Sequence, residues 1–117
     1  MQTAAIVLAL AAAGGFVLAV IRLKGEPWPP LWLALGHGAV AATGIGLLIY
    51  AAMQPGGIPT LAQVSLGVFV LAALGGATLF FGFHMRRKPL PIPFVLGHGL
   101  IAAVGLVLLL LDVFKLA

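Results

Sequence analysis

Four long apolar stretches, joined by short connections, constrain the fold of this chain more than any other feature. They cover residues 3–21, 31–53, 61–84 and 91–113. Each is close to the roughly 20 apolar residues that a helix needs to cross a bilayer. Of the 117 residues, 63% are hydrophobic and 7% charged, and a domain of that size cannot hide so much apolar surface from water. The sequence therefore predicts an all-α membrane protein, a bundle of four transmembrane helices that forms one domain over residues 1–117.

Charge is concentrated in two of the three connections between these stretches. Five of the six basic residues lie within residues 22–30 and 84–91, whereas the connection over residues 54–60 carries no charge. The first and third connections of a four-helix chain lie on the same side of the membrane, and the positive-inside rule places that side in the cytoplasm. We therefore expect a multi-pass protein of a bacterial inner membrane with both termini outside. Lys115, next to Asp112, is the one basic residue that does not follow this pattern.

The two halves of the chain align with each other at an offset of 61 residues, without a gap. This offset predicts two helical hairpin repeats, residues 1–53 and 61–114, joined by the uncharged linker 54–60. Repeats of the same orientation are related by an axis along the membrane normal, so we expect a pseudo-twofold bundle. The matched positions include Leu35–Gly38 with Leu96–Gly99, Gly14 and Gly15 with Gly75 and Gly76, and Pro30 with Pro91.

The repeated histidines, His37 and His98, are predicted to lie at one depth in the membrane. His37 follows Pro30 by seven residues, which is about 10 Å along a helix at ~1.5 Å per residue. The glycine pair of the preceding helix lies about as far from the same membrane surface, and the second half repeats this arrangement. One layer in the cytoplasmic half of the bilayer should therefore hold two imidazoles and two glycine pairs, which leave space beside the rings.

One interpretation of this layer is helix packing. Glycine and alanine let transmembrane helices approach closely, and His37, Ala41 and Gly44 share one face of their helix. Neutral histidines could then bond to each other or to a backbone carbonyl. The protein would be a cofactor-free accessory or structural subunit of a membrane complex.

The competing interpretation is a b-type haem. Such a haem is held by two imidazoles on opposite faces of its iron, and glycine leaves a flat slot beside each ligand. His37 and His98 are the candidate ligands of the haem iron, and the function would be one-electron transfer. Packing explains the glycines but not the repeated histidine, since two neutral imidazoles in lipid are costly without partners. The glycines expected to shape the slot are Gly36, Gly38, Gly97, Gly99, Gly14, Gly15, Gly75 and Gly76.

The expected architecture and the two Gly-His-Gly motifs resemble the four-helix haem-b cytochromes of bacterial membranes, the cytochrome b561-like proteins among them. The resemblance covers the helix number and the two histidines, and does not extend along the rest of the chain. It implies a haem b and electron transfer within the membrane. Those cytochromes often hold two haems with four histidines, whereas this chain has one matched pair. Residues 83–99 are also similar to small uncharacterised bacterial membrane proteins, which implies no function.

A small transporter and a pigment-binding subunit remain as lesser alternatives. The small multidrug transporters are similar in size but depend on an intramembrane glutamate, and the two acidic residues here, Glu26 and Asp112, lie at helix ends. A chlorin could take a single histidine as its axial ligand. The absence of cysteine excludes thiolate sites, and no set of nucleophile, base and orienting acid predicts an enzyme.

The expected partners are membrane lipids, and the electron donor and acceptor cannot be identified from the sequence. Nucleic acid is not expected, because the basic residues lie at helix ends. A homodimer or a larger membrane complex is compatible with the small-residue stripe Gly38, Ala42 and Gly46.

Local patterns give predictions for single polar residues. Thr60 with Gln63 matches a capping box at the start of the third stretch. His84 is expected to lie at the membrane interface, among headgroups and water. A hydrogen bond to a carbonyl of its own helix is expected for each of the hydroxyls of Thr43, Ser65 and Thr78.

Overall fold

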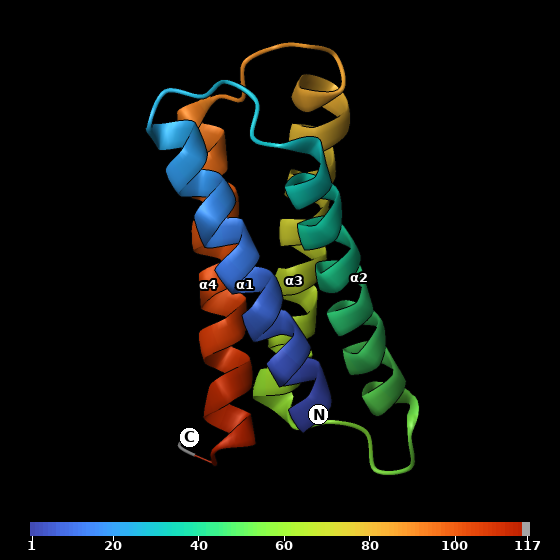
Figure 1. The fold of residues 1–117 in the computed structure, drawn as a ribbon. Coiled ribbons are helices and arrows are strands. Elements are labelled where there is room, and N and C mark those ends of the chain that lie inside the picture. Colours follow the sequence, from blue (N-terminus) through green and yellow to red (C-terminus); the bar gives the residue numbers. More distant parts are fainter. Residues whose placement is uncertain (116–117) are drawn as a thin grey trace.

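The structure, a computed structural model, describes residues 1–115; residues 116–117, the last two of the predicted domain, lie outside the described residues. All four long helices of the described part are long and apolar enough to span a membrane, and the predicted spans agree with them to within two residues at each end. The helices are α1 (Gln2–Leu23), α2 (Leu31–Met53), α3 (Thr60–Leu79), its continuation as the π-helix η1 (Phe80–His84), and α4 (Ile92–Val113) (Figure 1).

Proline and glycine mark where these helices begin and end. Pro30, Pro59 and Pro91 each immediately precede the first residue of α2, α3 and α4, where a fixed φ and a missing N–H cost nothing. Pro30 and Pro91 thus occupy the N-cap position, one residue before the first helical turn. Helix α1 ends before Gly25, whose φ of 107° favours glycine because it has no Cβ.

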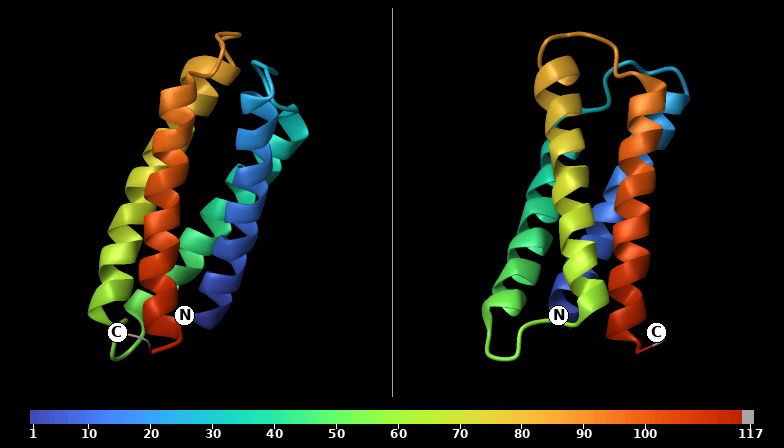
Figure 2. Two further views of the ribbon diagram at one scale, coloured as in Figure 1. Left: turned by 90° about the vertical axis from the view of Figure 1, so that its left-hand side faces the viewer. Right: turned by 180° about the vertical axis from the view of Figure 1, so that it is seen from behind.

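The helices form a four-membered ring in which α1 and α3 each pack against both α2 and α4. Helices α2 and α4 therefore lie diagonally across the bundle. The α2–α3 connection and the two termini lie at one end, called here the termini end, and the other two connections lie at the opposite loop end (Figures 1 and 2). The bundle measures 45 × 22 × 18 Å, which exceeds the ~30 Å hydrocarbon thickness of a bilayer.

The main buried cluster lies in the termini half and joins all four helices. A smaller cluster of Leu79, Leu90 and Val95 is buried near the loop end. Accordingly, the two hairpins lie closest together near the termini and separate towards the loop end (Figure 2, left). The main cluster consists of Ala4, Ala5, Leu8, Leu48, Ile58, Ala62, Phe69 and Leu109.

Close helix contacts in the first hairpin recur 61 residues later in the second. A Cβ built at Gly44 of α2 would lie 2.6 Å from Cγ of Leu8 in α1. A Cβ built at Gly105 of α4 would lie 3.3 Å from the ring of Phe69 in α3. Each glycine therefore lets the two helices of its hairpin approach more closely than any larger residue would allow.

The start of α3 is capped by a residue of α4. The Ala62 N–H donates a hydrogen bond to Oδ2 of Asp112, with a separation of 2.6 Å. The predicted capping box is wrong, because α3 has no cap bond from its own side chains and Nε2 of Gln63 donates to the Ile58 carbonyl instead. Asp112 supplies both the acceptor and the negative charge that a helix N-terminus favours.

Ser65 joins α3 to α4 rather than bonding within its own helix. Its buried hydroxyl donates to the Gly105 carbonyl at 2.7 Å, so the prediction for this residue is wrong. The predictions for Thr43 and Thr78 are confirmed, since each hydroxyl donates to the carbonyl four residues earlier. Ser65 differs from them because it faces the place where α4 comes close.

His84 lies at the loop end, is half-buried and has a specific partner there. Its Nε2 donates to the Pro29 carbonyl at 2.9 Å, and its ring stacks on that of Phe80. The residue therefore links the third connection to the first.

Removing the Asp112 carboxylate should destabilise the bundle at its termini end. We expect Asp112→Ala to lower the free energy of unfolding by about 1 kcal/mol, the usual cost of losing a helix cap. Thr60→Ala is the control and should have little effect, because Thr60 makes no cap bond. Thermal unfolding in detergent, followed by circular dichroism, measures both variants. Equal losses of stability would contradict capping by Asp112.

Candidate functional site

The two repeated histidines make the same hydrogen bond in their own hairpins. Nδ1 of His37 in α2 lies 2.8 Å from the Ala11 carbonyl of α1. Nδ1 of His98 in α4 lies 2.8 Å from the Ala72 carbonyl of α3. Because a carbonyl can only accept, Nδ1–H is the donor in each ring. In the neutral imidazole, Nε2 then keeps a free lone pair, and no residue within 1–115 hydrogen-bonds to it.

Each glycine pair accommodates the imidazole of its own hairpin. A Cβ built at Gly15 would lie 2.8 Å from Cε1 of His37, and one built at Gly76 would lie 3.0 Å from Cε1 of His98. The preceding glycine of each pair is in ordinary contact with the same ring. The space that the sequence assigned to a cofactor slot at these positions is therefore taken by the imidazoles themselves.

The glycines on either side of each histidine face open space instead. A Cβ built at any of Gly36, Gly38, Gly97 and Gly99 would have no atom of a neighbouring element within 4 Å. The backbone beside each imidazole is therefore bare, and these four glycines make no contact that requires the absence of a side chain.

The two imidazole rings meet across the bundle. Their centroids are 6.3 Å apart and their planes are inclined at 87°. The rings come from α2 and α4, the diagonal helices, and both side chains are half-buried. The structure thus brings His37 and His98 together, in the same layer as the two glycine pairs.

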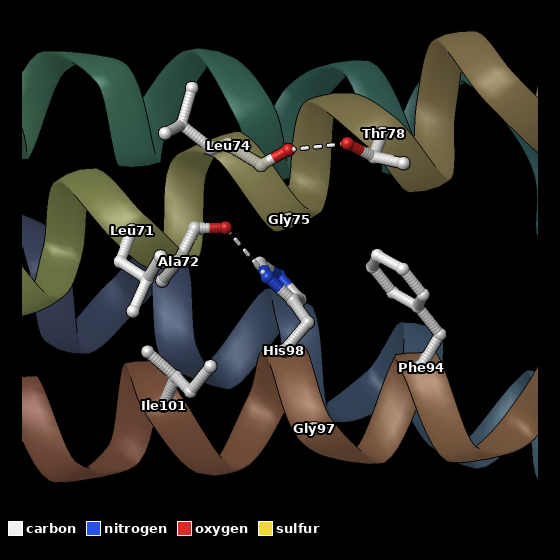
Figure 3. Close-up of a pocket in the computed structure, with 9 residues that line it drawn as sticks. All are labelled: Leu71, Ala72, Leu74, Gly75, Thr78, Phe94, Gly97, His98 and Ile101. Carbon is white, nitrogen blue, oxygen red and sulfur yellow. Dashed lines mark hydrogen bonds between the residues drawn. The ribbon is translucent and has the colours of Figure 1, made fainter.

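A hollow of about 420 Å³ opens between α3 and α4 next to His98. Nδ1 of His98 in α4 donates a hydrogen bond to the Ala72 carbonyl of α3, and the Thr78 hydroxyl donates one to the Leu74 carbonyl (Figure 3). The walls of the hollow are otherwise apolar. The remaining lining residues are Leu71, Gly75, Phe94, Gly97 and Ile101.

The carbonyl acceptors of the site could not be recognised as functional groups in the sequence. Ala11 and Ala72 are nevertheless matched at the offset of 61 residues, and each lies one helical turn before Gly15 or Gly76. The pattern that could have indicated them is an alanine and a glycine on one helix face that repeat at the same offset of 61 residues as the histidine.

Comparison of the chain with protein-family models, with curated proteins and with solved structures finds no match.

Substitution of Gly15 should be far more harmful than substitution of Gly36. Gly15→Ala places a methyl group against a ring held by the Ala11 carbonyl, and such overpacking costs about 1–3 kcal/mol. Gly36→Ala meets no neighbouring atom and gains up to about 1 kcal/mol from helix propensity. Unfolding in detergent measures both, and equal stabilities would contradict the contact between imidazole and glycine. Gly76→Ala should repeat the effect of Gly15→Ala.

Proposed function

We propose that the protein is a membrane electron carrier similar to b-type cytochromes, in which His37 and His98 bind the iron of one haem. The observation that carries this proposal is the meeting of two imidazoles at 6.3 Å, each with Nδ1 held by a carbonyl and Nε2 left free. Metal-binding histidines almost always donate their other ring N–H in this way, which fixes the required tautomer.

The separation of the rings would let His37 and His98 hold one metal ion together. An imidazole nitrogen binds a metal ion at about 2 Å, and a centroid separation of 6.3 Å would leave space for one ion between the two rings. The inclination of 87° is compatible with this arrangement, because each ring can take any angle about its own bond to the metal.

The number of donors favours haem over a bare metal ion. Two protein ligands suffice for a haem iron, because the macrocycle supplies the remaining nitrogens. A structural zinc site needs four protein ligands. Within residues 1–115, nowhere do three or more histidine, cysteine, aspartate or glutamate side chains come close enough together to hold a metal ion.

In this proposal the chain orients the ligands and excludes water. The carbonyls of Ala11 and Ala72 hold the imidazoles in place and fix the tautomer in which Nε2 is free. A macrocycle next to the glycines that flank each histidine would meet no side chain at those positions. A bound haem would supply the one-electron oxidation and reduction, with a potential that depends on its burial and on these hydrogen bonds.

We further propose that the bundle is pseudo-twofold and lies in a bacterial inner membrane with its loop end in the cytoplasm. The equal bonds of His37 and His98, and the matched contacts of Gly44 and Gly105, support the symmetry. The basic residues of the loop end support the orientation.

A cofactor-free packing role is the second candidate, because each imidazole already has an acceptor and fits against a glycine. The protein would then be an accessory subunit whose repeated histidines only clamp the helices of each hairpin together.

Absorption spectra of the detergent-purified protein separate the two candidates. With haem bound, we expect a Soret band that shifts on reduction with dithionite, together with sharp α and β bands. Either His37→Ala or His98→Ala should abolish these bands, whereas His84→Ala should retain them, because His84 lies at the loop end. A featureless visible spectrum from cells supplied with ample haem would overturn the haem proposal and favour packing.

The proposed orientation can be tested with single cysteines, since the chain has none of its own. Gln54→Cys, at the termini end, should react with a membrane-impermeant thiol reagent in intact spheroplasts. Glu26→Cys, at the loop end, should react only after lysis, and neither change removes a basic residue. The reverse pattern would contradict the proposed topology.

A further inference from the structure

The two loops at the loop end are bonded to each other, although about 60 residues separate them in the chain. Nε of Arg22 donates to the Leu90 carbonyl at 2.8 Å, and Nε1 of Trp28 donates to the Lys88 carbonyl at 3.0 Å. The bond from His84 to Pro29 is a third link. Membrane topology alone requires only that basic residues are present near the helix ends. The hydrogen bonds between the two loops therefore need another explanation.

These links join the two loops that carry the cationic residues of the loop end, called here the basic cluster. Arg87 adopts a φ of 57°, which is uncommon for a residue with a side chain, and its guanidinium lies 6.0 Å from the centroid of the Trp28 ring. Glu26 is the single carboxylate in these loops. The basic cluster consists of Arg22, Lys24, Arg86, Arg87 and Lys88, of which all but Arg22 are exposed.

The basic cluster lies where a phospholipid headgroup would be. Arg22 belongs to the last turn of α1, and Arg86 follows η1 by two residues, so both lie next to membrane-spanning helices. A hollow of about 800 Å³ beside the first loop combines the charged residues Lys24 and Glu26 with apolar side chains. Its remaining lining residues are Ile21, Gly25, Trp28 and Pro30. A phospholipid has a charged headgroup next to apolar acyl chains. It therefore matches a charged rim beside an apolar wall better than the surface of an acidic protein does.

We propose that the basic cluster is a binding site for the phosphate of anionic phospholipids, independent of any haem. Lysine and arginine near an anionic surface each contribute to attraction. The links between the loops arrange the cations before a lipid arrives, so less conformational freedom is lost on binding. The opposite end, with Asp112 and Lys115 as its charged side chains within the described residues, offers no such cluster.

Quenching of tryptophan fluorescence by brominated lipids tests this proposal in the full chain. The protein is reconstituted in phosphatidylcholine vesicles that contain a minor fraction of brominated phosphatidylglycerol or, for comparison, brominated phosphatidylcholine. Both tryptophans, Trp28 and Trp32, lie near the loop end and report local lipid. We expect about fivefold enrichment of the anionic lipid, which falls at high salt. Equal quenching by the two lipids would overturn the proposal and would point to an acidic protein as partner.

Matched variants distinguish a preorganised binding site from nonspecific electrostatic attraction of anionic lipid. Glutamine at Lys24, Arg86, Arg87 and Lys88 together should remove the preference, whereas Lys115→Gln should retain it. Trp28→Phe keeps every charge but removes the bond to the Lys88 carbonyl, and Trp32 still reports. The preference should then fall, while Trp32→Phe should keep it. A wild-type preference in Trp28→Phe would show that charge alone suffices and would overturn the built site.

Discussion

The rest of the structure depends on the hydrogen bond from each imidazole to a backbone carbonyl of the neighbouring helix. In a bilayer, a polar side chain is tolerated only when it finds a partner inside the protein. The bonds of His37 to Ala11 and of His98 to Ala72 provide that partner. They also set the distance between the two helices of each hairpin, and they explain why glycine occupies positions 15 and 76, where a methyl group would strike the ring.

This bond makes each hairpin a unit, and the proposed haem site lies between the two units. Buried apolar contacts join the hairpins in the termini half, and hydrogen bonds join their loops at the opposite end. Between these two attachments, the rings of His37 and His98 lie 6.3 Å apart, and Nε2 of each has no hydrogen-bond partner within residues 1–115. The structural and the redox interpretations of the histidines are thus compatible, because Nδ1 serves the fold while Nε2 is left for a ligand.

Much of the architecture could be predicted because each helix is specified locally. Hydropathy and length fix the four spans, and prolines such as Pro30 and Pro91 fix where helices begin. The depth of the histidines followed from helical rise. The partners of Asp112, Ser65 and His84 could not be predicted, because each lies on another helix or loop. Local rules assigned the cap of α3 to Thr60 and Gln63, Ser65 to its own helix and His84 to the membrane interface, since those are the only partners that neighbouring sequence can show.

The sequence by itself determined the number of helices, their ends, the concentration of charge at one end and the repetition of histidine with glycine. These properties depend on neighbouring residues and on the thickness of a bilayer. Only the tertiary structure decided which group fills the space beside the glycines, namely the imidazole of the same hairpin, and that the two rings lie 6.3 Å apart. Distances between helices depend on the packing of all four at once, and no local pattern carries that information.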